Sequence, residues 1–321
     1  MKNIAICCDG TGNEFGQNNT NVVETYLALD KDDDQIAYYD PGVGTGGWEY
    51  QEERGELRAM GDKATGYGLQ KNVEDACRFL ADNFEEGDRV YLFGFSRGAF
   101  TVRSLAGMIF KCGLLRPGHD NLVEYASRIY NTEDNAAVAA GFLEAFGRSC
   151  PIHFIGVWDT VESLVMHAGK RFHDATLNPD VSFGYHALAI DERREDFLPS
   201  PWDESRAVEG QTIEQVWFAG VHSDVGGWYD DRGLSNISLH WMLGKAAGCG
   251  LRLTMPTEER LKPNPHGEGH HSDTGFWRIR GRSARKIPDS ARIHRSVIAR
   301  MDNPANRYQP NNLPEEPTLV D

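Results

Sequence analysis

Ser96 lies in the pentapeptide Gly94–Gly98 (GFSRG), which has the G-x-S-x-G pattern of a nucleophilic serine. The preceding run Arg89–Phe93 is β-branched and aromatic and has the length of a buried strand. After the pentapeptide, apolar residues recur at helical spacing: Leu105, Met108, Ile109 and Cys112. A sharp strand-to-helix turn needs glycines beside the serine and presents the hydroxyl at the positive end of a helix. The pattern predicts a nucleophile elbow, with an ordinary strand-to-helix turn as the alternative.

A serine hydroxyl is a poor nucleophile at neutral pH, so it needs a base, and the base needs an orienting carboxylate. Asp159 follows the apolar run Pro151–Trp158, and His222 follows the apolar run Ile213–Val221. Because the carboxyl ends of parallel strands meet at one edge of a sheet, both side chains are expected beside Ser96. The order Ser, Asp, His is that of the α/β-hydrolase fold. A helix cap for Asp159 and a buried, hydrogen-bonded role for His222 remain alternatives.

Other residues could take the same roles. Four could replace the acid or the base: Asp9 and Asp224 as acids, and His271 and His294 as bases. The backbone N–H of Arg97 is the expected first donor of an oxyanion hole, and Gly10 or Thr11 the second. These two follow the apolar run Asn3–Cys8, where a simple glycine turn is the alternative. The loop lacks the lysine of a phosphate-binding P-loop.

Residues 262–275 (KPNPHGEGHHSDTG) contain a cluster of possible metal ligands: His266, His270, His271 and Asp273. No strand or helix is expected there to fix their geometry, so a polar Gly/Pro-rich loop is favoured and no cofactor is predicted. A metal-dependent phosphoesterase using Asp9, His222, Asp224 and these histidines remains an alternative. A binding protein that keeps a hydrolase fold without turnover is another.

Composition excludes several classes of protein. The 321 residues contain 33 basic and 48 acidic side chains, a net charge of −15, and no basic stripe. Nucleic acid and anionic membrane surfaces are therefore not expected partners. The six cysteines show no C-x-x-C spacing and indicate a reducing compartment. With no signal peptide and no apolar segment of about 18 residues, the chain is expected to be cytoplasmic as synthesised.

The alternation of apolar strands and helices predicts one α/β-hydrolase-like domain over residues 1–321, with a mostly parallel sheet flanked by helices. Further elements are expected as follows: a strand at Gln35–Tyr39, and helices at Val22–Leu29 (capped by Thr20 and Asn21), 69–84, Asn121–Tyr130, Ala136–Phe146, Tyr185–Ile190 and Ile237–Ala247 (capped by Ser235 or Asn236). Residues 165–212 are expected to form a cap and 40–66 the rim of the site. The charged run 191–195 is expected at a solvated helix end, and the tail 303–321 extended or frayed.

Several motifs together resemble one known family: CDGTGN at 8–13, YYDPGVGT at 38–45, GFSRGAFTVRSLAGMI at 94–109, GVWDTV at 156–161 and WFAGVHSDVGGWY at 217–229. The chain resembles, from Ile4 to about His294, the bacterial and fungal α/β-hydrolase family long filed as a domain of unknown function. That family includes phospholipase effectors of type VI secretion systems.

The resemblance implies a serine esterase or phospholipase A reaction with Ser96 as nucleophile, Asp159 as acid and His222 as base. It also implies export without a signal peptide, with a secretion carrier or an immunity protein as partner. Secreted members usually carry an additional membrane-docking region, which is not expected within these 321 residues. A phospholipid and a soluble ester therefore both remain expected substrates.

Overall fold

The computed structural model describes residues 1–10, 16, 18–42, 66–161, 176–255, 261–272 and 281–321. An eight-stranded sheet forms its centre, with the strand order β10-β9-β8-β7-β6-β3-β1-β2 and every neighbouring pair parallel. The strands are β1 Asn3–Cys8, β2 Gln35–Asp40, β3 Arg89–Phe95, β6 Ile152–Trp158, β7 Val181–Ala189, β8 Thr212–Phe218, β9 Arg292–His294 and β10 Thr318–Val320. A small antiparallel pair, β4 (Leu114–Leu115) and β5 (Gly147–Arg148), lies apart from this sheet.

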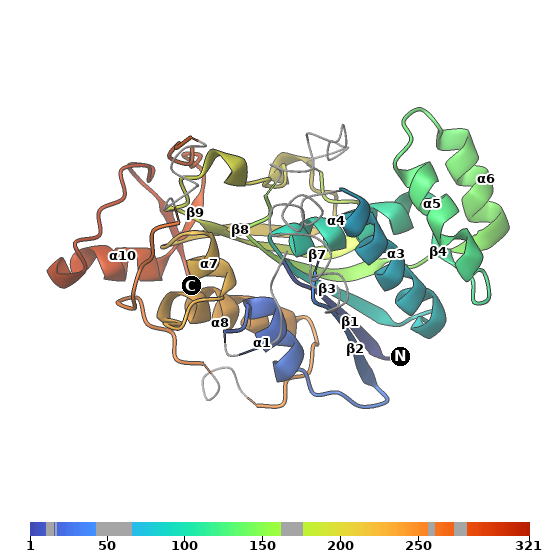
Figure 1. Cartoon of the computed structure of the whole chain (residues 1–321), viewed down its shortest axis with the longest axis horizontal. Helices are drawn as coiled ribbons and strands as arrows, with labels where there is room; N and C mark the ends of the chain where they lie inside the picture. Colours follow the sequence, from blue (N-terminus) through green and yellow to red (C-terminus); the bar gives the residue numbers. More distant parts are fainter. Residues whose placement is uncertain (11–15, 17, 43–65, 162–175, 256–260, 273–280) are drawn as a thin grey trace, which may run out of the picture.

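Helices cover both faces of the sheet (Figure 1). They are α1 Asn21–Ala28, α3 Gly66–Asn83, α4 Arg97–Cys112, α5 Val123–Tyr130, α6 Ala136–Phe146, α7 His222–Gly226, α8 Gly233–Gly248 and α10 Arg295–Asp302, with 3-10 turns at Asp120–Leu122, Glu195–Phe197, Glu204–Arg206 and Pro304–Asn306. In β1, Ile4 and Ile6 pack with α3 and α4 on one face, whereas Ala5 and Cys7 pack with α1 and α8 on the other. Because both faces are covered, most residues of the central strands are apolar.

This architecture confirms the predicted α/β-hydrolase-like fold class. The elbow strand and helix, the strand before Asp159 and the helix Ala136–Phe146 are present as predicted. Thr20 caps α1 by accepting a hydrogen bond from the N–H of Val23 at 3.3 Å, as predicted. Asn21 is not a cap, because it is the first residue of the helix. The predicted caps of α8 are wrong, because that helix begins at Gly233 and Ser235 lies inside it.

The predicted helix over Tyr185–Ile190 is also wrong. Residues 185–189 belong to β7, which pairs with β6 on one side and β8 on the other, and Ile190 directly follows the strand. The local sequence GYHALA contains good helix formers, but pairing on both edges and burial of the strand outweigh this weak propensity. Of the range 165–212 expected as a cap, Val181–Ala189 therefore lie inside the sheet, and residues 165–175 lie outside the described residues.

The C-terminal tail does not fray at its end. Residues Thr318–Val320 form β10, which adds to β9 in parallel. Earlier in the tail, the hydroxyl of Tyr308 donates a hydrogen bond to Asp191 at 2.8 Å. The tail is thus attached to the sheet edge and to the loop that follows β7.

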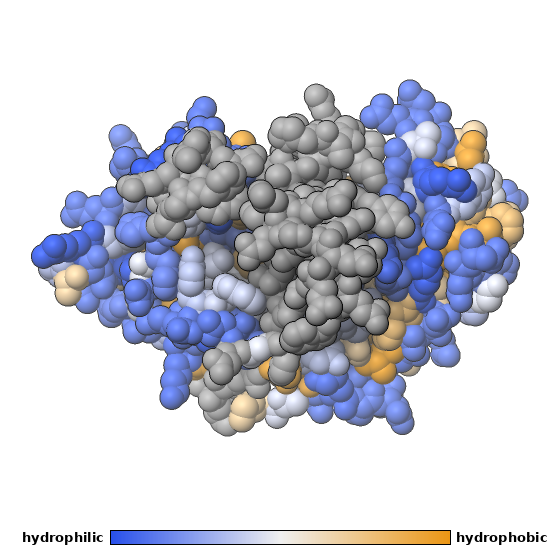
Figure 2. Space-filling model, viewed as in Figure 1, coloured by the Kyte–Doolittle hydropathy of each residue, from blue (hydrophilic) through white to orange (hydrophobic). Residues whose placement is uncertain are grey.

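The visible surface is largely hydrophilic, and hydrophobic residues gather on the side where α5 and α6 lie (Figure 2). Tyr125 on α5 and Val138 on α6 are among the exposed large apolar side chains. No helix in the described ranges is long and apolar enough to cross a bilayer. Of the segment expected to rim the site, residues 43–65 lie outside the described residues.

Candidate active site

Ser96 connects β3 to α4 with a backbone φ of 56° and ψ of −120°, in the left-handed half of conformational space. A non-glycine residue rarely adopts this conformation, and such strain is typical of functional sites. The N–H of Ser96 donates to the carbonyl of Trp158 at 3.0 Å, which fixes the turn against the end of β6. Ser96 is also the N-cap of α4, so the first N–H groups of the helix face its side of the turn.

The glycines of the pentapeptide permit close backbone approaches. A Cβ on Gly98 would collide with the carbonyl oxygen of Cys8 and lie 2.6 Å from that of Asp9. A Cβ on Gly94 would lie 2.5 Å from the carbonyl oxygen of Gly98. These contacts bring α4 directly against the end of β1, so the elbow needs glycine at both positions.

Replacing Gly98 with alanine is expected to destabilise the protein by about 1–3 kcal/mol, because backbone must shift to make room. Gly141→Ala is the matched control: Gly141 lies in exposed α6, and nothing lies within 4 Å of its added Cβ. That variant should gain about 0.5–1 kcal/mol from its higher helix propensity. Urea unfolding of both variants measures the difference, and equal stability of the two would contradict the tight elbow.

Asp159 follows β6 with a φ of 42° and is fully buried. The β3–β6 register pairs Phe95 with Trp158, which places Ser96 and Asp159 at the ends of neighbouring strands. Its Oδ1 accepts a hydrogen bond from the N–H of Ala189 at 3.0 Å. The strand ends therefore bring the two residues to one edge of the sheet.

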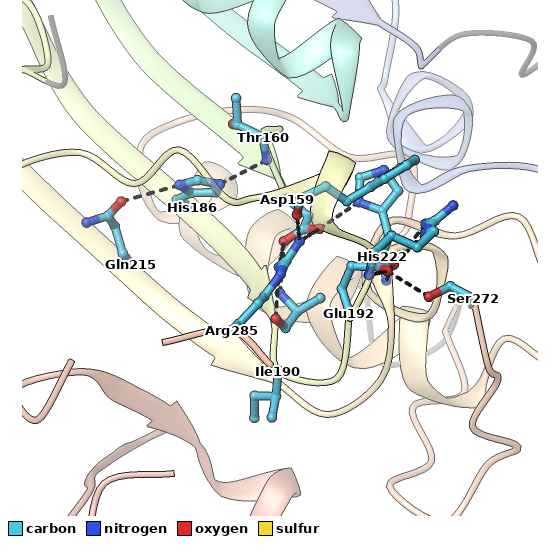
Figure 3. Close-up of polar contacts among 12 residues, drawn as sticks. Asp159, Thr160, His186, Ile190, Glu192, Gln215, His222, Ser272 and Arg285 are labelled. Atoms are coloured by element: carbon cyan, nitrogen blue, oxygen red, sulfur yellow. Dashed lines mark hydrogen bonds and ion pairs between the residues drawn. The ribbon is translucent and has the colours of Figure 1, made fainter. Parts of the chain in front are cut away.

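Arg285 binds Asp159 through both of its terminal nitrogens (Figure 3). Its Nη1 lies 2.5 Å from Oδ1 and its Nη2 lies 2.9 Å from Oδ2. Burial alone would raise the pKa of Asp159, but the charge of Arg285 and the hydrogen bond from His222 outweigh it. The pKa of Asp159 is therefore held well below its ordinary value, and the carboxyl group stays ionised.

His222 begins α7, just beyond β8, and its Nδ1 lies 2.6 Å from Oδ2 of Asp159. The ring packs against Phe95 at 4.6 Å and Phe197 at 5.0 Å between centroids. Burial lowers the pKa of His222, which favours the neutral imidazole. Because an ionised carboxylate only accepts hydrogen bonds, Nδ1 carries the proton and Nε2 is left to act as a base.

Among the described residues, no hydrogen bond joins Ser96 to His222. The rings of Phe95 and His222 are nevertheless in contact, and Phe95 directly precedes Ser96. Catalytic hydrogen bonds are often long in the absence of substrate and tighten when it binds. The ring contact places His222 next to the turn that carries Ser96.

Glu192 holds the backbone of His222 through a hydrogen bond. It is 1% exposed, and its Oε2 accepts the N–H of His222 at 3.3 Å. Arg194 forms an ion pair with it at 2.8 Å, and the hydroxyl of Ser272 donates to Oε1 at 2.7 Å. The prediction that residues 191–195 form a solvated helix end is wrong for Glu192, because this carboxylate is buried and fully engaged.

His186 supports the loop that carries Asp159. Its Nε2 accepts the N–H of Thr160 at 3.2 Å, and its Nδ1 lies 3.3 Å from the amide oxygen of Gln215 (Figure 3). Burial lowers the pKa of His186 to about 3, so the ring is neutral and cannot serve as a second cationic centre. Pattern reasoning missed Arg285, Glu192 and His186, because each lies far from its partner in the sequence and belongs to no motif.

The competing acids are occupied elsewhere. Asp9 accepts hydrogen bonds from the N–H of Gly10 at 2.7 Å and from the hydroxyls of Thr20 at 2.7 Å and Tyr39 at 3.1 Å. Asp224 accepts from Nδ1 of His270 at 2.7 Å. Neither carboxylate is hydrogen-bonded to His222.

Among the described residues, neither of the competing bases is hydrogen-bonded to Asp159. His294 caps α10 through a 3.2 Å hydrogen bond from the N–H of Ser296, and burial lowers its pKa to about 4. His271 is exposed on the loop that follows His270. His222 is therefore the histidine that this structure brings to the ionised carboxylate beside the elbow.

The two sides of the expected oxyanion hole differ in what the structure describes. Arg97 is the first residue of α4, so its N–H belongs to the helix turn next to Ser96. The N–H of Gly10 donates to Asp9, and Thr11 lies outside the described residues. In this arrangement Gly10 does not offer a ready second donor.

The histidine-rich loop shows no convergent ligand set in the part of the chain that the structure describes. His266 lies 2.9 Å from the amide nitrogen of Asn306, and His270 pairs with Asp224 and stacks on Tyr229. Asp273 lies outside the described residues.

A parallel sheet with helices on both faces, and a strained serine between a strand and a helix, define an α/β-hydrolase-like protein. The model of the family described as "T6SS, Phospholipase effector Tle1-like, catalytic domain" matches residues 2–245. Because the match covers well over half of the chain, this protein belongs to that family.

Three relatives illustrate the range of the similarity. "Uncharacterized protein YEL023C" of Saccharomyces cerevisiae is 36% identical over 217 residues, which are 61% of this chain and 32% of that protein. The crystal structure of an uncharacterised protein from Pseudomonas aeruginosa matches at 19% identity and a TM-score of 0.45, over 81% of this chain and 47% of that one. A structure of the Tle1 effector bound to the VgrG spike of the type VI secretion system matches at 18% identity and a TM-score of 0.40, over 73% of this chain and 52% of that one. The chain thus spans about a third to a half of the relatives it matches.

Proposed function

We propose that this protein is a serine hydrolase that cleaves a carboxylic ester through an acyl-enzyme formed on Ser96. The observation that carries the proposal is the 2.6 Å contact between His222 and the buried, ionised Asp159, beside a serine held at a φ of 56°. A lone strained serine or a lone carboxylate–histidine pair would be less informative. Together they supply a nucleophile, a base and an orienting group.

In the proposed reaction, Oγ of Ser96 attacks the acyl carbonyl while Nε2 of His222 takes the serine proton. Asp159 keeps the imidazole oriented and stabilises the imidazolium as it forms. The N–H of Arg97 stabilises the developing oxyanion, aided by the positive end of α4. His222 then returns the proton to the leaving alcohol. Water, activated by the same histidine, releases the acid and regenerates Ser96.

We propose a phospholipid or a related lipid ester as the substrate, cut as by a phospholipase A. Membership of a family described as phospholipase effectors supports this substrate class. The same family description supports a further proposal, that the chain is delivered by a type VI secretion system with a carrier protein and is countered by an immunity protein. Secretion compared between producer strains with and without a functional system tests that delivery, and equal release from both would contradict it.

A panel of phospholipids and short soluble esters, with products identified by mass spectrometry, tests the reaction. We expect release of a free fatty acid with a matching lysophospholipid, because the nucleophile is suited to an acyl carbonyl. Hydrolysis should continue in the presence of a chelator. Release of a phosphorylated head group, or loss of activity on chelation, would contradict the ester mechanism and favour a metal-dependent phosphoesterase.

A further inference from the structure

Arg285 stands out because it places a full positive charge on the acid of the proposed triad. The guanidinium meets Asp159 with both terminal nitrogens, at 2.5 and 2.9 Å, and is only 3% exposed. Oδ2 of Asp159 is shared between Nη2 of Arg285 and Nδ1 of His222. A bidentate arginine fixes the plane of a carboxylate as well as its charge. We infer that Arg285 is a positioning residue that holds Asp159 toward His222 and limits how strongly this carboxylate favours a protonated imidazole.

Arg285 is itself held in place by other segments. Its Nη1 donates to the carbonyl of Ala189 at 2.9 Å, and its Nη2 donates to that of Phe197 at 2.7 Å. Asn312, in the C-terminal tail, donates its side-chain amide to the carbonyl of Arg285 at 3.1 Å. The arginine therefore connects the end of β7 and the tail to the proposed triad, and it lies beyond the 2–245 region of the family match.

The charges around His222 show why one arginine matters. Asp159 and Glu192 favour the protonated ring of His222, and Arg194 opposes it. Arg285 acts through Asp159, whose negative charge it partly neutralises. On α7 itself, Asp224 is engaged with a different histidine. Burial outweighs the two carboxylates, so the pKa of His222 is lowered.

Removing Arg285 would leave one unbalanced negative charge beside the imidazole. A nearby negative charge favours the protonated ring, so the pKa of His222 should rise. His222 would then be neutral over a narrower range of pH. The rise of the reaction rate on the acidic side of its pH profile should therefore move to higher pH. This inference rests on the proposed serine mechanism. Its electrostatic part, the change in the pKa of His222, can be measured without any hydrolysis of substrate.

The test compares Arg285→Met and Arg285→Lys with the wild-type protein. His222 is followed by NMR titration of its ring, and the rate of Ser96 labelling by a fluorophosphonate probe is measured across pH. We expect Arg285→Met to raise the His222 midpoint and the labelling limb together, by about one pH unit. Arg285→Lys keeps the charge but loses the bidentate geometry. The pH at which labelling of Ser96 begins to rise should therefore stay the same, while the maximal labelling rate at high pH falls roughly tenfold or more.

Arg300→Met is the matched control. Arg300 is also a buried arginine, but its Nη1 donates to the carbonyls of Pro265 and Gly267 at 2.8 Å. That variant is expected to lose stability without moving the His222 midpoint. An unchanged midpoint in Arg285→Met overturns the inference, as does a plateau rate in Arg285→Lys equal to that of the wild type. If Arg285→Met does not fold, the maximal labelling rate of Arg285→Lys decides whether the inference holds. A shifted midpoint in protein whose Ser96 takes no probe would instead contradict the serine mechanism and leave the electrostatic role standing.

Discussion

Replacing Ser96 with alanine is expected to lower ester hydrolysis by about four orders of magnitude, since no other group in the proposed mechanism can form the acyl-enzyme. The fold should persist, because the Ser96 side chain makes no cap hydrogen bond to α4. The measurement is the initial rate on the best ester of the panel, with thermal unfolding as a check on folding. A Ser96→Ala protein that keeps more than a tenth of the wild-type rate would contradict the assignment.

Ser104→Ala provides the control for this experiment. Ser104 is buried on the same helix, α4, at a similar exposure to Ser96. The Ser104→Ala substitution also removes a serine hydroxyl, but from inside α4 and away from the strand-to-helix turn. Its rate should stay within about threefold of the wild type, and any loss should follow lost stability alone.

The second large effect is expected for His222. Replacing it with alanine removes the general base, and the rate should fall by about 10⁴-fold. Binding of an uncleaved ester analogue should change much less, because the substrate does not depend on the base for its affinity. The initial rate and the analogue's dissociation constant measure the two effects separately.

His270→Ala is the matched control, because the chain contains two similar carboxylate–imidazole pairs. Nδ1 of His270 lies 2.7 Å from Asp224, much as Nδ1 of His222 lies 2.6 Å from Asp159. Of these two pairs, His222–Asp159 is the one whose ring packs on Phe95, next to Ser96. The His270→Ala variant should therefore keep most of the activity. A large loss in His270→Ala with a small loss in His222→Ala would reverse the proposed roles.

Local sequence signals were enough to predict the fold class and the strands that precede Ser96, Asp159 and His222, but not the short helix α7 that His222 begins. Buried parallel strands have apolar sequences, and polar residues at their ends stand out against that background. The elbow is visible for a similar reason, because its glycines are required by contacts within a few residues. The catalytic roles of the three residues stay a prediction until they are tested.

The supporting residues could not be found in this way. Glu192 lies in a run of charges that resembles a solvated surface, yet tertiary packing buries it beneath His222. Arg285 is separated from Asp159 by 126 positions and sits in an unpatterned basic stretch. The strand β7 was missed because helix propensity is weak compared with pairing on both edges of a strand. In each case the deciding interaction joins residues far apart in the sequence. The periodicity of apolar residues cannot predict such an interaction.

The most direct test of the central claim is to locate the residue modified by a fluorophosphonate probe in the intact wild-type protein. Peptide mass spectrometry of the labelled protein should place one adduct on Ser96, within the peptide that joins β3 to α4. Prior denaturation should abolish the labelling, because the reactivity depends on His222 and Asp159 being folded around the serine. Absence of an adduct on folded protein that hydrolyses esters, or an adduct on another residue, would contradict Ser96 as the nucleophile.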